Sequence, residues 1–351
     1  MKTVEVGNLT PGMIIAKTVF NADFLVILLA NTVINEKHIL ILKSLQIPGV
    51  EIKDDFDLSK IYQTALSLQD KNFSFIRDVE KISKLAQKIY DEVKAGGEIK
   101  AAVTILVSKI LPIIDNHATI TQLFKMNNSS PTLANHGVRV AIIAGVIAKW
   151  MRLPLENIRI IVTAAFLHDI GKYRFPPQML AKFPTDLKGV ELQLNKTHCQ
   201  SGRNLLQGFK FAEPIPTIVF QHHECMNGSG FPMAINGQEI HQFAKIVAVA
   251  DAYDRMITER PGFTKKTPFE VVRMIANDQY SHYDPFVCMP FITGMKDHLL
   301  GANVTLKDGR TGKVVFYPKD FVSLPLIKLE DETDLDLNQN SENLIVDYDI
   351  T

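Results

Sequence analysis

The segment FLHDIGK, residues 166–172, decides how the central part of this chain folds and what it can bind. It places His168 beside Asp169 at the end of an apolar run that begins near Ile160. The apolar run predicts a buried helix, so both polar side chains are expected inside the fold. Imidazole nitrogens and carboxylate oxygens are common ligands of transition metals. The segment therefore predicts part of a buried metal site carried by helices.

Further candidate ligands occur nearby in the chain, most of them in apolar segments. They are His136, His198, the pair His222 and His223, and Asp251. A single histidine in such a place is more often a core or surface residue than a ligand. Several imidazoles and two carboxylates buried together without a cation would be costly, and a cation removes that cost. The group as a whole predicts a metal-dependent hydrolase.

The composition is that of an ordinary globular protein. The chain has 351 residues, of which 46% are hydrophobic, and a formal net charge of zero. These values argue against a broad surface for nucleic-acid polymers. Three scattered cysteines without a C-x-x-C pair predict neither a disulfide framework nor a thiolate zinc site. Apolar runs are interrupted well before the roughly 20 residues that a membrane helix needs, and no signal peptide is recognisable, so we expect a cytoplasmic protein.

Turn signals and apolar spacing divide the chain into five predicted parts. Alternating apolar residues and a Pro-Gly turn predict a β-rich unit at the start, and Asp308–Gly309 predicts a hairpin near the end. The acidic tail is expected to be solvated and partly disordered, with a strand at Leu344–Val346 as the alternative. The parts are a small β-rich unit at 1–55, a helical connecting or regulatory region at 56–127, the domain with the candidate ligands at 128–300, a β-hairpin extension at 301–330, and the acidic tail at 331–351.

Five helices are expected to carry the candidate ligands to one centre. Helix bundles commonly hold metals through side chains on facing helices. The predicted fold class is therefore mainly α, a helical bundle with a small N-terminal β-rich unit and a short C-terminal β extension. The expected helices are 133–151 with His136, 155–170 with His168 and Asp169, 190–206 with His198, 216–224 with the histidine pair, and 240–258 with Asp251.

The order of these motifs resembles that of the HD-domain phosphohydrolases, and within them the HD-GYP phosphodiesterases of bacterial cyclic-di-GMP signalling. The resemblance covers roughly residues 135–294 and implies an HD-type helical bundle. It also implies two divalent metal ions; imidazole and carboxylate ligands suit iron or manganese, with zinc as the alternative. The similar segments are HDIGK at 168–172, His198-x-x-x-Gly202, HHECMNGSGFP at 222–232 and VAVADAYD at 247–254.

The resemblance also implies which residues hold each metal. Two metals about 3.5–4 Å apart can activate a bridging water for in-line attack on phosphorus. Lys172 and Asp169 are the implied catalytic residues, and Lys172 would face the scissile phosphate and neutralise developing charge. His136, His168, Asp169 and Asp251 would hold one metal, and Asp169, His198, His222 and His223 the other.

The chain departs from the family pattern at three places. Thr132 stands where some members have a glutamate that holds a third metal, so we expect two metals. Phe231 replaces the tyrosine of the Gly-Tyr-Pro motif, within a loop, 228–232, that is a candidate docking site for a partner protein. Arg260 matches a substrate-contacting arginine and is, with Lys172, a predicted substrate-binding residue. Phe263 stands where the family has a basic residue, which puts the choice of dinucleotide in doubt.

The leading prediction is hydrolysis of the phosphodiester bonds of cyclic di-GMP to pGpG or GMP. The alternatives are a phosphodiesterase for another cyclic dinucleotide such as cyclic GMP-AMP, a non-catalytic protein that senses a dinucleotide or a partner, and a general nucleotide phosphohydrolase. The intact ligand set argues against the sensing protein, and the GSGFP segment argues against the general phosphohydrolase. The expected partners are the cyclic dinucleotide, a partner protein and a second copy of the chain in a homodimer; a membrane is not expected.

Overall fold

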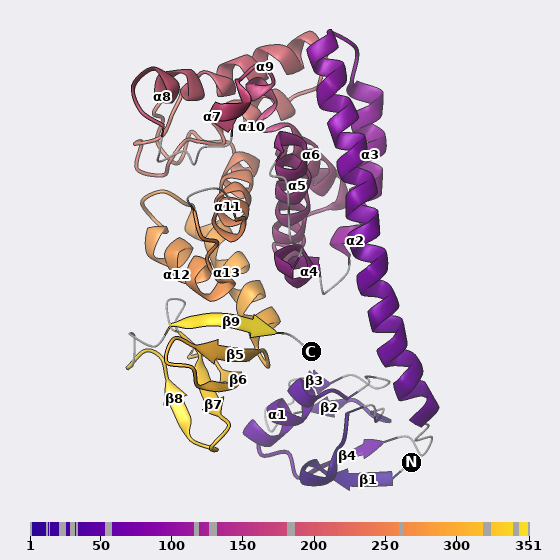
Figure 1. Ribbon diagram of the computed structural model, residues 1–351. Coiled ribbons are helices and arrows are strands. Elements are labelled where there is room, and N and C mark those ends of the chain that lie inside the picture. The colour runs from indigo at the N-terminus through magenta and orange to yellow at the C-terminus, as the bar shows by residue number, and fades with distance from the viewer. Residues whose placement is uncertain are drawn as a thin grey trace. The chain divides into compact units, whose positions relative to one another are not determined.

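Figure 1 shows the computed structural model of the chain. It forms two compact units, Met1–Phe73 with Leu300–Ala302, and Ser74–Leu299 with Asn303–Thr351. The predicted boundaries near residues 55, 127, 300 and 330 stay predictions. The structure describes residues 2–11, 13, 15–20, 26–28, 32, 34–52, 58–115, 119–125, 132–180, 187–259, 263–318, 324–339 and 344–349, with the side chains of the helix that begins at 58 described from residue 75.

The first unit is small and contains two short antiparallel strand pairs and a helix. Strand β1 pairs with β4, and β2 pairs with β3. The helix α1 begins at a capping box in which the Asn35 side chain accepts from the His38 N–H. Val4, Ile15 and Leu42 lie in the apolar core of this first unit. Its elements are β1 (Lys2–Glu5), η1 (Val6–Asn8), β2 (Val19–Phe20), β3 (Val26–Leu28), α1 (Glu36–Ser44) and β4 (Gly49–Ile52).

The second unit is a helical bundle around α5 (Leu133–Trp150). Every residue of α5 from His136 to Ala148 is buried, which follows from its nearly continuous apolar sequence. It packs against α3, α6, α11 and α13. The other helices are α2 (Leu58–Ala95), whose residues up to Phe73 belong to the first unit, α3 (Lys100–Ile114), α4 (Thr119–Lys125), α6 (Leu155–Leu167), η2 (Ile170–Lys172), α7 (Pro177–Leu180), α8 (Gly189–Lys196), α9 (His198–Gly208), α10 (Ile215–Gln221), α11 (Gln242–Ile257), α12 (Pro268–Asp278) and α13 (Pro285–Leu299).

A five-stranded antiparallel sheet completes the second unit, drawn in yellow tones in Figure 1. Its strand order is β8-β7-β6-β5-β9, and the expected hairpin across Asp308–Gly309 joins β5 to β6. The predicted fold class, mainly α with small β elements at both ends, is confirmed. The strands are β5 (Asn303–Leu306), β6 (Thr311–Phe316), β7 (Leu326–Leu329), β8 (Asp334–Asp336) and β9 (Ile345–Asp349).

Part of the predicted acidic tail is folded, contrary to the expectation of a solvated end. β8 and β9 form the two edges of the sheet, so the alternative of a strand near 344–346 is the one observed. The reason is that apolar side chains in the tail become buried. The Tyr348 ring lies 4.9 Å from the Phe124 ring and 5.6 Å from the Phe269 ring, measured between centroids. Burial of an aromatic ring offsets the cost of ordering this charged segment.

Membrane insertion through a helix finds no support among the described residues. None of their helices combines the length and the apolar character needed to cross a bilayer.

Candidate metal centre

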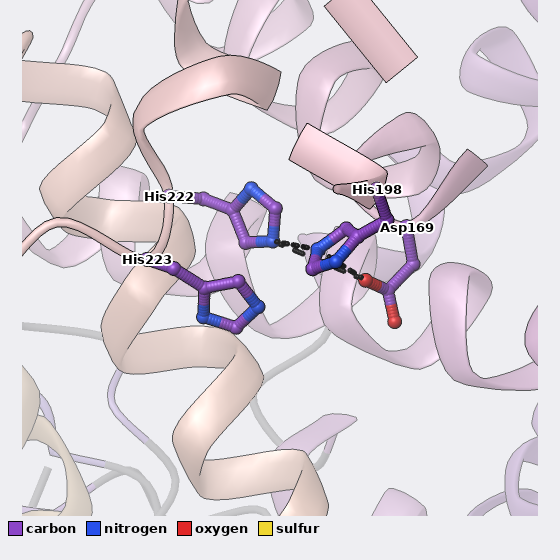
Figure 2. Close-up of side chains that lie close together, drawn as sticks. All are labelled: Asp169, His198, His222 and His223. Atoms are coloured by element: carbon purple, nitrogen blue, oxygen red, sulfur yellow. Dashed lines mark hydrogen bonds and ion pairs between the residues drawn. The ribbon is translucent and has the colours of Figure 1, made fainter. Parts of the chain in front are cut away.

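The structure brings all seven predicted ligands together in the second unit. They come from α5, the ends of α6 and α10, the start of α9, and α11. Figure 2 shows the first of the two groups that they form. Within each group one possible ligand atom of every residue lies within 4.8 Å of those of the others; the groups are Asp169, His198, His222 and His223, and His136, His168 and Asp251.

Three of the expected ligand-carrying helices end or break at places that change where their candidate ligands stand. Helix α6 ends at Leu167, so His168 is its C-cap and Asp169 begins a separate 3₁₀ turn, η2. The expected helix over 190–206 is broken at Thr197 into α8 and α9, so that His198 opens α9. Helix α10 ends at Gln221, before the histidine pair. Most of the ligands therefore stand at helix ends, where the backbone direction changes and adjacent side chains can approach one centre.

Two glycines explain how the turn with Asp169 approaches the helix with His198. A Cβ atom on Gly171 would lie 2.0 Å from the carbonyl oxygen of His198 and 2.7 Å from the backbone nitrogen of Gly202. A Cβ on Gly202 would in turn meet Val219 of α10 at 3.0 Å. Only glycine allows this close backbone approach. The spacings HDIGK and His198-x-x-x-Gly202 thus have a packing reason as well as a chemical one.

Backbone carbonyls orient three of the histidines. The Nδ1 atom of His168 lies 2.6 Å from the Ala165 carbonyl oxygen, and that of His222 lies 2.7 Å from the Val219 carbonyl oxygen. His198 has the same contact with the Asn195 carbonyl. A carbonyl can only accept, so each ring carries its proton on Nδ1 and presents the lone pair of Nε2 to the centre. This is the arrangement by which outer contacts prepare histidines for metal binding.

His136 is oriented by a carboxylate that the sequence analysis missed. Its Nδ1 lies 2.8 Å from Asp254 Oδ2, and Asp254 is itself paired with Arg139 at 2.5 Å. Both Asp254 and Arg139 are buried. The available signal was the spacing, because Asp254 follows Asp251 by three residues and so lies on the same side of α11. Burial raises the pKa of Asp254, but Arg139 and His136 outweigh it and bring the pKa to about 2.

Four buried polar atoms of the centre have no hydrogen-bond partner among the described protein atoms. Buried polar groups are nearly always satisfied, so such a cluster indicates a missing ligand. His136 Nε2 lies 2.9 Å from Asp251 Oδ1, without hydrogen-bond geometry. Neutral imidazoles and carboxylates are a suitable donor set for divalent cations. The residues present therefore fit a metal centre; the four atoms are His136 Nε2, His168 Nε2, His223 Nε2 and Asp169 Oδ1, the last of which has an ion-pair contact with Lys172 Nζ at 2.8 Å.

The electrostatics of the centre keep the carboxylates ionised and most of the imidazoles neutral. Burial raises the pKa values of Asp169 and Asp251, but the surrounding cations outweigh it and hold both well below the usual range. Burial lowers the pKa of His222 to about 3, with a further lowering by the nearby His168. The pKa values of His198 and His223 are lowered for the same first reason. Metals bind these protonation states, carboxylate and neutral imidazole.

The metal-free protein is expected to lose stability as the pH falls from about 6.5 toward 3. In that window the unfolded chain binds protons on His198, His222 and His223 that the folded chain does not, so unfolding is favoured by acid. Each of these three histidines lowers the free energy of unfolding by up to about 1.4 kcal/mol per pH unit of acidification. Burial lowers the pKa of His168, but Asp169 and Asp251 outweigh it and raise the pKa overall, so His168 is protonated in both the folded and the unfolded chain within this window and does not change the slope.

Urea denaturation of the metal-free protein at several pH values measures this slope. A His222→Gln variant serves as the control, because it removes one titrating group and should flatten the dependence. A free energy of unfolding that stays constant or rises on acidification would contradict the assignment of neutral buried histidines.

Lys172 is buried within the centre. Its Nζ lies 2.8 Å from both oxygens of Asp169. Burial lowers its pKa, although Asp169 acts in the opposite direction. The other predicted substrate-binding residue, Arg260, lies outside the described residues.

The loop at 228–232 is fixed to the histidine pair. The Phe231 ring stacks on the His223 ring with centroids 4.6 Å apart, and its N–H donates to the His223 carbonyl. The buried Glu224, which the sequence analysis did not single out, accepts hydrogen bonds from the backbone N–H groups of Met233 and Ile235 at 2.7 and 3.2 Å. Phe231 thus supports a candidate ligand by packing, and needs no hydroxyl for that contact.

Thr132, another departure from the family pattern, has a structural place, and so has Lys265, which follows the departure at Phe263 by two residues. Thr132 is the N-cap of α5, where its side chain accepts from the Asn135 N–H at 3.1 Å. Lys265 lies with its Nζ 4.5 Å from the centroid of the Phe124 ring. Thr132 therefore has a capping role in place of a ligand role, and Lys265 is engaged in a cation–π contact.

A pocket of 330 Å³ adjoins the centre. His222, His223 and Asp251 reach its wall from the candidate ligands, together with Arg255. Other parts of the wall come from Met256, Met274, Asp278 and Tyr283. A ligand bound there would therefore touch both the candidate metal ligands and a mixed apolar and polar surface, as small-molecule sites usually provide.

The pattern of the chain matches a family model for the HD domain over residues 122–287. This segment of the chain is similar to HD domains. It contains all seven candidate ligands as well as Lys172, Arg139, Asp254 and Arg255.

Curated relatives are similar to parts of this chain. The cyclic di-GMP phosphodiesterase PA4108 of Pseudomonas aeruginosa is 30% identical over 212 residues, which is 60% of this chain and 51% of that protein. The cyclic di-GMP phosphodiesterase response regulator RpfG of Xanthomonas campestris is 39% identical over 125 residues, 35% of this chain and 33% of that protein. Matches also include 3'3'-cGAMP-specific phosphodiesterases of Vibrio cholerae. The chain spans about half or less of the length of the curated relatives it matches.

A solved structure supports the fold. Bd1817, an HDG"Y"P protein from Bdellovibrio bacteriovorus, superposes with a TM-score of 0.53 at 18% identity and covers 84% of this chain and 98% of that one. At this identity the similarity shows a common fold.

Proposed function

We propose that the HD domain of this chain is an HD-GYP-type phosphodiesterase that hydrolyses cyclic di-GMP with two divalent metal ions. The observation that carries the proposal is the convergence of the seven ligands in two groups, with Asp169 between them. Asp169 belongs to one group, and its Oδ2 lies 3.7 and 3.6 Å from Nε2 of His136 and His168 in the other. One carboxylate can therefore serve both metals.

Iron or manganese is the proposed metal, with zinc as the alternative. His136, His168, Asp169 and Asp251 would hold one ion, and Asp169, His198, His222 and His223 the other. When bound, the pair supplies an activated water and stabilises an in-line displacement at phosphorus.

The chain's own residues would hold and complement this centre. The carbonyls of Ala165, Asn195 and Val219 keep three imidazoles in the ligating tautomer. Lys172, in contact with both oxygens of Asp169, is placed to neutralise negative charge that develops on the phosphoryl oxygens. The pocket beside His222, His223 and Asp251 is large enough to receive part of a nucleotide. Arg260 remains a proposed contact with the substrate.

A different cyclic dinucleotide is the second candidate substrate. It is favoured by Phe263, which stands where the family pattern has a basic residue, and by the cyclic GMP-AMP specificity in the names of some relatives. The predicted contact of a partner protein with 228–232 and the predicted homodimer stay predictions.

The proposal predicts about two metals per chain and conversion of cyclic di-GMP to pGpG or GMP. The test is anaerobic reconstitution with iron(II) or manganese(II), metal analysis, and chromatography of digests on the same sample. Parallel digests of cyclic GMP-AMP separate the two candidate substrates. Two metals with cleavage of cyclic GMP-AMP alone would favour the second candidate. No bound metal and no turnover would contradict the proposal and favour a binding protein.

A further inference from the structure

Arg255 of α11 bridges the two carboxylates on which the proposed metal centre depends. Its Nε lies 2.7 and 2.8 Å from the two oxygens of Asp251, and its Nη2 lies 3.0 Å from Asp169 Oδ2. The Arg255 side chain is 11% exposed. Asp169 and Asp251 belong to different ligand groups. A single guanidinium therefore occupies oxygen lone pairs that both proposed metals need.

The balance of charges in the centre favours this position of Arg255 only when no metal is bound. The centre contains three carboxylates, on Asp169, Asp251 and Asp254. It also contains three cations, of which Arg139 pairs with Asp254, Lys172 with Asp169, and Arg255 with both ligand carboxylates. The charges therefore cancel before any metal is bound. Two divalent ions at the same carboxylates would repel the guanidinium strongly, because burial weakens screening.

The surroundings of Arg255 offer it a second place. Arg255 lines the pocket of 330 Å³ that also borders Asp251, with Met256, Met274 and Tyr283 on the wall. An arginine side chain can turn into such a space by rotation of its own torsions, with no movement of α11. Its fork of N–H donors also matches two oxygens of a phosphate group.

We propose that Arg255 is an alternating cation with two positions. In the metal-free protein it pairs with the carboxylates of Asp169 and Asp251. Metal binding displaces it into the pocket, where it contacts a phosphate of the substrate. This inference rests on the proposed two-metal function. It makes Arg255 a competitor of the metals and a substrate-binding residue of the loaded enzyme. The two roles give opposite consequences when the guanidinium is removed.

The test compares Arg255→Met with the unchanged protein in a competition titration of manganese(II) against a chelating dye, without substrate. Removal of the competing cation should lower the dissociation constant of the metal by about tenfold or more, since hydrogen bonds between charged groups are the strong ones. At saturating manganese, KM for cyclic di-GMP should rise by about tenfold, because a contact with phosphate is lost. Arg255→Lys keeps the charge and loses the fork of N–H donors. Its metal dissociation constant and its KM should lie between those of Arg255→Met and the unchanged protein.

Matched measurements separate this role from a merely structural one. Arg273→Met on α12, where the side chain is exposed, should leave both constants unchanged. Thermal unfolding should show a lower melting temperature for metal-free Arg255→Met, and a larger rise on adding manganese than in the unchanged protein. A structural defect would instead weaken metal binding.

Two outcomes would overturn the inference. Equal metal affinities and equal KM values in Arg255→Met and the unchanged protein would refute the alternating cation while leaving the two-metal function standing. Absence of metal binding in both proteins would refute the proposed function and the inference with it.

Discussion

Replacing Asp169 by alanine is expected to abolish binding of both metals and to lower the hydrolysis rate by about a thousandfold or more. Asp169 is 1% exposed and is the residue whose oxygens lie near Nε2 atoms of both ligand groups. Its loss removes the proposed bridging ligand and leaves Lys172 and Arg255 without one of their partners. Metal analysis and chromatography of cyclic di-GMP digests on one sample provide the measurement.

Folding of the Asp169 variants must be checked separately. Removal of one member of a buried ion pair costs about 3–5 kcal/mol, so Asp169→Asn, which keeps the shape, is the second variant. Asp115→Asn is the matched control, because Asp115 is exposed and pairs with Lys149 at a distance from the ligand groups. Full activity of a folded, metal-depleted Asp169→Ala protein would end the two-metal account.

Replacing Lys172 by methionine is expected to retain about two metals and to lower the rate by about 100-fold. The lysine is not among the ligand groups, so metal binding should survive. Its charge, held beside Asp169, is proposed to act on the phosphoryl oxygens. A fall in kcat with little change in metal content is the expected signature of stabilisation in the transition state.

Lys149→Met provides the control for Lys172, since Lys149 is an exposed lysine in an ion pair with Asp115. Lys149→Met should retain the metal content and the hydrolysis rate of the unchanged protein. If Lys172→Met turned over cyclic di-GMP at the unchanged rate, Lys172 would be a structural partner of Asp169 and would have no catalytic role. Loss of metal in a folded Lys172→Met protein would likewise contradict the assigned role.

The candidate ligands could be picked out from the sequence because each is a polar residue at a recognisable spacing, most of them in apolar segments. His168 and Asp169 stand out at the end of an apolar run, and the glycines 171 and 202 mark the places where backbones must approach. The helix end at Leu167 could not be predicted, because the apolar spacing continues past it to Ile170. Tertiary contacts of the backbone set the helix ends here, and the spacing of apolar residues does not report those contacts.

The supporting residues were less accessible to sequence reasoning. Asp254 and Arg139 are 115 residues apart, and only the packing of α11 against α5 makes them a pair. Arg255 looks like an ordinary cation near the end of a helix until its distances to Asp169 and Asp251 are known. In the tail, the many charges of residues 331–351 suggested solvation and hid the few apolar side chains that anchor β9.

The sequence by itself determined the mainly helical fold class and the candidate ligands, because these follow from local spacing and from the chemistry of single side chains. Only the tertiary structure decided the two groupings, the tautomers of His168, His198 and His222, and the placement of Arg255 between two carboxylates. Those features depend on distances between segments far apart in the chain. Such distances are fixed by the packing of α5, α6, α9, α10 and α11 as a whole, and no local pattern records them.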